Sequence, residues 1–137
     1  MAKTLHIKNE MGQLSLLNQF LEESMQEYGL EGAARMNLKL AIEEAVVNII
    51  SYAYPGKKEE NITVSLEHGI NRLTVVITDA GIAFDPTDKK KDPDLSLPLE
   101  ERPIGGLGTF LLRQLMTDVS YTRSGNKNIL TMIKETD

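Results

Sequence analysis

Two polar residues at helical spacing combine the side chains needed for a metal site and a base in phosphate chemistry. Glu44 and Asn48 are four residues apart in a segment with helical periodicity, so both lie on one face, one turn apart. Their neighbours are apolar, which indicates a covered face where a carboxylate and an amide need partners. An Asn48 oxygen together with phosphate oxygens suits Mg²⁺, while Glu44 could accept the proton of an incoming hydroxyl. Glu43 is the alternative base, and a solvent-exposed pair is the plainer alternative.

A strand end further along the chain has the groups to recognise a purine base. The apolar segment 74–78 is followed by Asp79 and Gly81. An Asp79 carboxylate could accept a hydrogen bond from the exocyclic amine of adenine, and Gly81 would let the base approach the backbone. An ordinary turn after a strand is the alternative interpretation.

A glycine-rich turn before a late helix could bind phosphate. Gly105, Gly106 and Gly108 surround Leu107, and Thr109 follows within the helical segment. Free amides and the helix dipole at such an N-terminus attract anions. The spacing fits neither a P-loop nor a Rossmann fingerprint. Glycines required only for packing are the alternative.

The periodicity of the chain predicts the elements that must position these residues. Helices are expected over 11–28, 33–54 and 106–116, and strands over 4–8, 61–69, 72–79, 119–123 and 129–134. Hairpin-linked strands separated from helices are typical of an α+β fold: a two-layer sandwich with a mostly antiparallel mixed sheet and three helices on one face. The predicted buried stripe of the second helix is Leu38, Ala41, Ile42, Ala45 and Ile49.

The segment from Asp85 to Pro103 is predicted to lack regular structure. It holds four of the five prolines and a run of three lysines. Structureless loops of this length inside a compact domain are usually lids or binding loops. Because it lies between the Asp79 motif and the glycine-rich turn, we expect a lid at about residues 85–104, with a flexible insertion as the alternative.

Composition limits the classes of function. The 137 residues suit one domain spanning 1–137, and the net charge of −5 argues against a nucleic-acid partner. The chain has no cysteine, which fits a reducing compartment. The N-terminus has no signal-like apolar core and no segment is apolar enough to span a bilayer, so we expect a cytoplasmic protein without a membrane partner.

Taken together, the motifs resemble the N, G1 and G2 boxes of the GHKL ATPases, the superfamily of gyrase, MutL, histidine kinases and the anti-sigma factor serine kinases. Glu44-x-x-x-Asn48, Asp79-x-Gly81-x-x-Phe84 and Gly106-Leu107-Gly108 carry the resemblance. The runs 44–55 and 101–112 are most similar to the anti-sigma factor serine kinases of the RsbW/SpoIIAB type. The likeness covers essentially the whole chain.

This resemblance implies a Bergerat ATP-binding fold and assigns roles to residues. It makes Glu44 the general base and Asn48 the Mg²⁺ ligand, and it places adenine at Asp79 and Gly81. The remaining residues implied in the nucleotide site are Phe84, Arg102, Gly105, Gly106, Leu107, Gly108, Thr109 and Thr131. Thr131 is similar to a family threonine that supports adenine through water. Arg102, two residues before Ile104, stands for an arginine that often precedes the glycine core, and Leu107 replaces the family's methionine.

The resemblance also implies partners. Members of this branch phosphorylate a serine on an anti-anti-sigma protein of the STAS type and sequester a sigma factor, usually as homodimers. A nucleotide-dependent binding module without phosphotransfer is the alternative. A histidine kinase fragment is a third hypothesis, which we disfavour because the chain begins at the domain itself and carries no phosphoacceptor helix.

Overall fold

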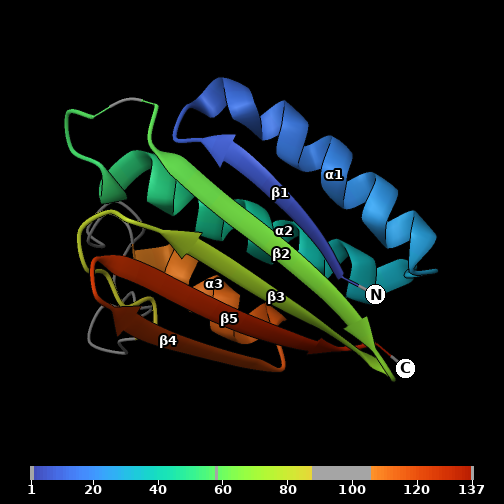
Figure 1. The fold of residues 1–137 in the computed structure, drawn as a ribbon. Helices are drawn as coiled ribbons and strands as arrows, with labels where there is room; N and C mark the ends of the chain where they lie inside the picture. Colours follow the sequence, from blue (N-terminus) through green and yellow to red (C-terminus); the bar gives the residue numbers. More distant parts are fainter. Residues whose placement is uncertain (1, 58, 88–105, 137) are drawn as a thin grey trace, which may run out of the picture.

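The chain folds into two layers, an antiparallel sheet and a set of helices that covers one of its faces (Figure 1). The computed structural model describes residues 2–57, 59–87 and 106–136, with the backbone alone for 106–110. In chain order its elements are β1 (Ala2–Lys8), the 3₁₀ turn η1 (Met11–Gln13), α1 (Leu14–Glu27), α2 (Gly32–Asn48), the π-helical turn η2 (Ile49–Ala53), β2 (Asn61–Gly69), β3 (Arg72–Asp79), α3 (Gly106–Leu115), β4 (Asp118–Ser124) and β5 (Lys127–Glu135).

The five described strands are arranged in the order β1-β2-β3-β5-β4, and every neighbouring pair is antiparallel. The register of the strand pairs places one residue of each strand side by side in a row across the sheet. Because successive side chains of a strand alternate between faces, the residues of one row share a face. The row that matters for the site is Ile7, Ile62, Asp79, Asn128 and Arg123. Asp79 and Asn128 are therefore direct cross-strand neighbours although 49 positions separate them.

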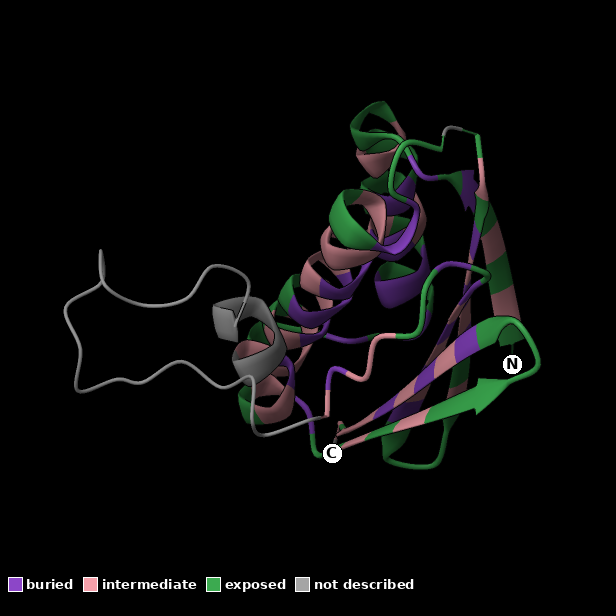
Figure 2. Cartoon of the chain, turned by 90° about the vertical axis from the view of Figure 1, so that its left-hand side faces the viewer, coloured by how far each residue is buried: buried purple, intermediate pink, exposed green. Residues whose placement is uncertain are grey.

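The core lies between the sheet and the helices, where the buried bands of both layers face each other (Figure 2). Helix α1 buries Leu17, Leu21 and Met25. Helix α2 buries four of its five predicted stripe residues, and the fifth, Ile49, is partly buried against the same core. Among the described residues no helix is long and apolar enough to cross a membrane.

The predicted α+β sandwich with its helices on one face is confirmed. The sheet, predicted as mostly antiparallel and mixed, is antiparallel in every described pair. The strands 61–69 and 72–79 have the predicted bounds, and the other strands extend one to two residues further than predicted. The expected helix over 33–54 differs, because α-helical geometry ends at Asn48 and a π-helical turn continues to Ala53. Tyr54 then leaves the helix with φ −127°, immediately before Pro55.

Candidate functional site

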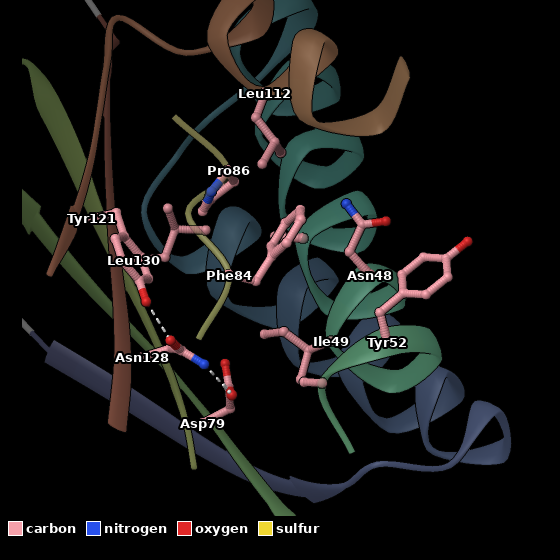
Figure 3. Close-up of a pocket in the computed structure, with 12 residues that line it drawn as sticks. Asn48, Ile49, Tyr52, Asp79, Phe84, Pro86, Leu112, Tyr121, Asn128 and Leu130 are labelled. Carbon is pink, nitrogen blue, oxygen red and sulfur yellow. Dashed lines mark hydrogen bonds between the residues drawn. The ribbon is translucent and has the colours of Figure 1, made fainter. Parts of the chain in front are cut away.

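A pocket of about 470 Å³, part of it open to solvent, lies between the helices and the sheet. Figure 3 shows helix residues on one side and sheet residues on the other, with Phe84 and Pro86 between them. The described residues that line the pocket are Ala45, Asn48, Ile49, Tyr52, Ala53, Asp79, Phe84, Pro86, Leu112, Tyr121, Asn128 and Leu130.

Asp79 is the buried carboxylate of this pocket, with only 5% of its surface exposed. Its Oδ1 accepts hydrogen bonds from the backbone N–H of Gly81 at 2.9 Å and from Nδ2 of Asn128 at 2.9 Å. Its Oδ2 receives no hydrogen bond within the described part of the chain. A carboxylate oxygen left free in a pocket can accept a hydrogen bond, so this arrangement suits a ligand that brings an amine.

Asn128 is a site residue that the sequence interpretation missed. It is 5% exposed and uses both ends of its amide. Nδ2 donates to Asp79 Oδ1 and to the carbonyl of Ile82 at 2.9 Å, while Oδ1 accepts from the Tyr121 hydroxyl and from Nη1 of Arg123 at 3.0 Å. The signal that could have found it is its strand register with Asp79, which requires knowing that β3 pairs with β5.

The end of β3 is held by Tyr54 from beyond the π-helical turn. Its hydroxyl accepts a hydrogen bond from the N–H of Ala80 at 2.6 Å and donates to the carbonyl of Asn61 at 3.1 Å. Burial raises the pKa of Tyr54, and the charge of Asp79 adds to this effect. The hydroxyl therefore stays protonated and fixes the strand end next to the pocket.

Gly81 has a structural requirement of its own. A Cβ built on it would lie 2.3 Å from the carbonyl oxygen of Ala53. That oxygen accepts a hydrogen bond from the N–H of Ile82 at 2.8 Å. The absence of a side chain thus allows the loop after β3 to contact the π-helical turn, in addition to any approach by a ligand.

Asn48, the last residue of α2, lines the pocket from the helical side. Its Nδ2 is buried and has no hydrogen-bond partner in the described residues. An orphaned amide in a pocket needs a partner from a ligand, which agrees with a site for polar groups such as phosphate oxygens or a hydrated cation.

Both glutamates considered as the base lie on α2 but do not line this pocket. Glu44 is partly buried, one turn before Asn48, and next to the lining residue Ala45. Glu43 lines a separate surface groove with Met36 and Leu40 on α2. Glu44 therefore lies one helical turn before a pocket residue, whereas Glu43 lines a separate groove.

Several predicted residues lie elsewhere or outside the description. Arg102, Gly105 and most of the expected lid fall in the undescribed segment 88–105. Helix α3 begins at Gly106, as predicted, so the backbone of Gly106, Leu107, Gly108 and Thr109 forms its first turn. Leu112 of the same helix lines the pocket.

Thr131 needs a correction. It pairs with Val76 and Ser120, whereas the pocket residues Asn128 and Leu130 lie on the alternate positions of β5. Successive side chains of a strand point to opposite faces, so Thr131 lies on the sheet face away from the pocket. The polar residue of β5 that faces the site is Asn128.

The donor set fits a metal bound mainly through phosphate. Within the described ranges no group of three or more acidic or histidine side chains could hold an ion by itself. Mg²⁺ keeps several waters and commonly takes only one or two protein oxygens beside phosphate oxygens. Asn48 can provide such an oxygen, and this pocket is therefore compatible with a magnesium nucleotide.

The family model of the histidine kinase-like ATPase domain matches residues 7–134. Curated relatives include the serine-protein kinase RsbW of Bacillus thuringiensis and of Bacillus cereus, each 33% identical over 99 residues. These matches cover 69% of this chain, and the chain spans 60% of the relatives' length.

Solved structures have the same fold. The RsbU and RsbW domains of Rv1364c from Mycobacterium tuberculosis align with 98% of this chain and 32% of that chain, at a TM-score of 0.67 and 15% identity. The histidine kinase AdeS of Acinetobacter baumannii aligns with 98% of this chain and 68% of its own, at a TM-score of 0.54 and 16% identity.

Proposed function

Because this chain belongs to the histidine kinase-like ATPase domain family, we propose that it binds Mg-ATP in the pocket between α2 and the sheet and phosphorylates a serine of a protein partner. One observation carries the proposal. Asp79 Oδ2 and Asn48 Nδ2, from the two layers of the fold, both lack a hydrogen-bond partner in the described chain and both residues line this pocket. Adenine at Asp79 and the phosphates toward Asn48 satisfy both residues with one ligand.

The proposed orientation of ATP follows from the chemistry of its two ends, the adenine base and the phosphates. We place the 6-amino group of adenine at Asp79 Oδ2 and the phosphates at the N-terminus of α3, where backbone amides would attract them. When bound, Mg²⁺ offsets phosphate charge in the transition state, and Asn48 would hold it through Oδ1. Arg102 and the lid at about 85–104 belong to this proposal as further phosphate contacts and as a cover.

Glu44 is the proposed base. The serine oxygen forms a bond to the γ-phosphorus, and the bond between that phosphorus and the β–γ bridging oxygen breaks. The serine proton passes to the Glu44 carboxylate, and ADP is the leaving group. The place of Glu44 on α2, one turn before the pocket residue Asn48, supports it over Glu43, which lines a different surface groove.

The proposed partners come from the relatives. Proteins named serine-protein kinase RsbW match this chain, so we propose an anti-sigma factor that phosphorylates a STAS-type anti-anti-sigma protein and sequesters a sigma factor. We further propose that the protein acts in the cytoplasm and that it is a homodimer. Sedimentation equilibrium would test the oligomeric state directly.

The decisive experiment measures phosphate transfer from labelled ATP to STAS-type proteins encoded beside this gene. E44Q should lower the rate by roughly 10²–10⁴-fold, the usual contribution of a general base, with little change in ATP affinity. E43Q is the matched control on the same helix and should transfer at the wild-type rate. Loss in E43Q but not in E44Q would move the base to Glu43.

The alternative is a nucleotide-dependent binding module without phosphotransfer. A wild-type protein that binds Mg-ATP but phosphorylates none of these partners would refute the kinase proposal. If ATP then changed the affinity for a sigma factor, and E44Q behaved like wild type, the binding module would be the better description.

A further inference from the structure

Asn128 occupies the centre of the hydrogen-bond network behind the candidate adenine site. Its Nδ2 donates to Asp79 Oδ1 at 2.9 Å (Figure 3). The same Nδ2 donates to the carbonyl of Ile82 at 2.9 Å. Its Oδ1 is held from the other side by Tyr121 and Arg123 on β4. An amide whose two ends are both bound cannot rotate, so the network fixes which end faces Asp79.

We propose that Asn128 is a positioning residue that sets the base specificity of this pocket by orienting the Asp79 carboxylate. This inference rests on the proposed nucleotide function and concerns how Asp79 distinguishes one purine from another. The terminal torsion of an aspartate is broad, so the orientation of the carboxylate depends on the donors around it. Two donors on Oδ1, from Gly81 and Asn128, fix the carboxylate plane and leave Oδ2 as the free acceptor.

The orientation of Asp79 has a direct consequence for purine recognition. An adenine base presents a 6-amino donor to Oδ2, whereas hypoxanthine and guanine present a carbonyl oxygen at the same position. Two oxygens facing each other leave a buried acceptor unpaired, which a site built for a donor rejects. If the Asp79 carboxylate were free to rotate, it would bind the 6-amino group of adenine less well. It would also turn away from the 6-carbonyl of hypoxanthine or guanine more easily, so the pocket would distinguish these bases less.

Arg123 connects this hydrogen-bond network to the loop after β3. Its Nη1 donates to the Gly81 carbonyl at 2.8 Å and to Asn128 Oδ1 at 3.0 Å. The strand carrying Asn128 and the loop carrying Gly81 are thereby held to one guanidinium group. Both donors to Asp79 Oδ1 are therefore positioned by the same cation.

The test compares ATP with inosine triphosphate, which differs from ATP at the 6-position of the base. We expect wild type to prefer ATP in calorimetry. N128A should lower ATP affinity about 10-fold with no matching loss for inosine triphosphate, so the preference contracts about 10-fold. N128D keeps the shape of the side chain and an Oδ1 acceptor for β4, but it replaces the donor to Asp79 with a second carboxylate oxygen that repels it. It should contract the preference at least as much.

Asn126 provides matched controls, because it is exposed in the hairpin between β4 and β5. N126A and N126D make the same chemical changes and should leave both affinities within about 2-fold of wild type. Thermal unfolding of each variant establishes that it is folded. If N128A does not fold, the isosteric N128D carries the test alone.

The outcomes separate this inference from the proposed function. A wild-type protein that fails to bind ATP, or binds both nucleotides equally, refutes the adenine site and the inference with it. A wild type that prefers ATP, with variants at position 128 that keep the preference or lose both nucleotides in equal proportion, refutes the positioning role and leaves the adenine site intact. A smaller preference for ATP over inosine triphosphate in the variants at position 128 supports the positioning role of Asn128.

Discussion

The contact between Gly81 and Ala53 gives the sharpest stability prediction. In Gly81→Ala, the added Cβ would lie 2.3 Å from the Ala53 carbonyl oxygen and 2.6 Å from the Ala53 Cβ. The φ of Gly81 lies outside the left-handed region, so steric overlap is the cause of any destabilisation. The obstacle is backbone, which cannot turn aside as a flexible side chain can.

The expected magnitude combines two effects. Overpacking of a well-packed site costs about 1–3 kcal/mol. Moving the loop away also breaks the hydrogen bond from the Ile82 N–H to the Ala53 oxygen, now 2.8 Å long, at a cost of about 1 kcal/mol. Gly81→Ala should therefore lower the free energy of unfolding by about 2–4 kcal/mol, and Tm by roughly 10 °C.

Urea unfolding followed by far-UV circular dichroism measures this difference. Gly12→Ala is the control, because a Cβ at Gly12 meets nothing within 4 Å and its φ is not positive. It should be neutral or stabilise by up to about 1 kcal/mol. A Gly81→Ala protein within about 0.5 kcal/mol of wild type would refute the steric argument.

Three further predictions test charge and hydrogen bonding. Hydrogen bonds from Lys39 and Arg35 hold the pKa of Glu22 below its ordinary 4.5, so the stability they confer is present above that pH and is lost as pH falls through the lowered pKa. Unfolding of wild type and E22Q should therefore converge in acid, and a difference that persists at low pH would contradict this. D79N should weaken ATP binding roughly 10–100-fold in calorimetry, because the amide can present a donor to the adenine amine; unchanged affinity would remove Asp79 from the site. Tyr54→Phe should lower the free energy of unfolding by about 1–3 kcal/mol in urea, because a backbone N–H at the end of β3 loses its acceptor, and a neutral result would show that the hydroxyl is dispensable.

The periodicity of the chain was sufficient to predict the elements and their layering. Alternation in 61–69 and 72–79 specifies two strands joined by a short turn, and the observed bounds agree with the predicted ones. Hydrophobic spacing likewise predicted the buried face of α2. These features depend on contacts near in sequence or on which face is apolar, and both can be read from one chain.

The sequence also indicated that Asn48 and Asp79 belong to one site, and both line the same pocket. It did so through the resemblance to the N and G1 boxes. The residue types alone, Asn48 on an apolar helix and Asp79 at the end of an apolar strand, indicated only that each could bind a ligand. The roles given to Glu44, Arg102 and the glycine-rich turn remain predictions.

Only the tertiary structure decided which residues support that site. Asn128 and Thr131 are both polar residues on β5, and the pairing of β3 with β5 determines that the former faces the pocket and the latter the other face. The contact of Gly81 with Ala53 depends on a π-helical turn whose apolar spacing is indistinguishable, over one turn, from that of an α-helix. Strand register and the close approach of two backbones are relations between segments far apart in the chain, and local periodicity carries no information about them.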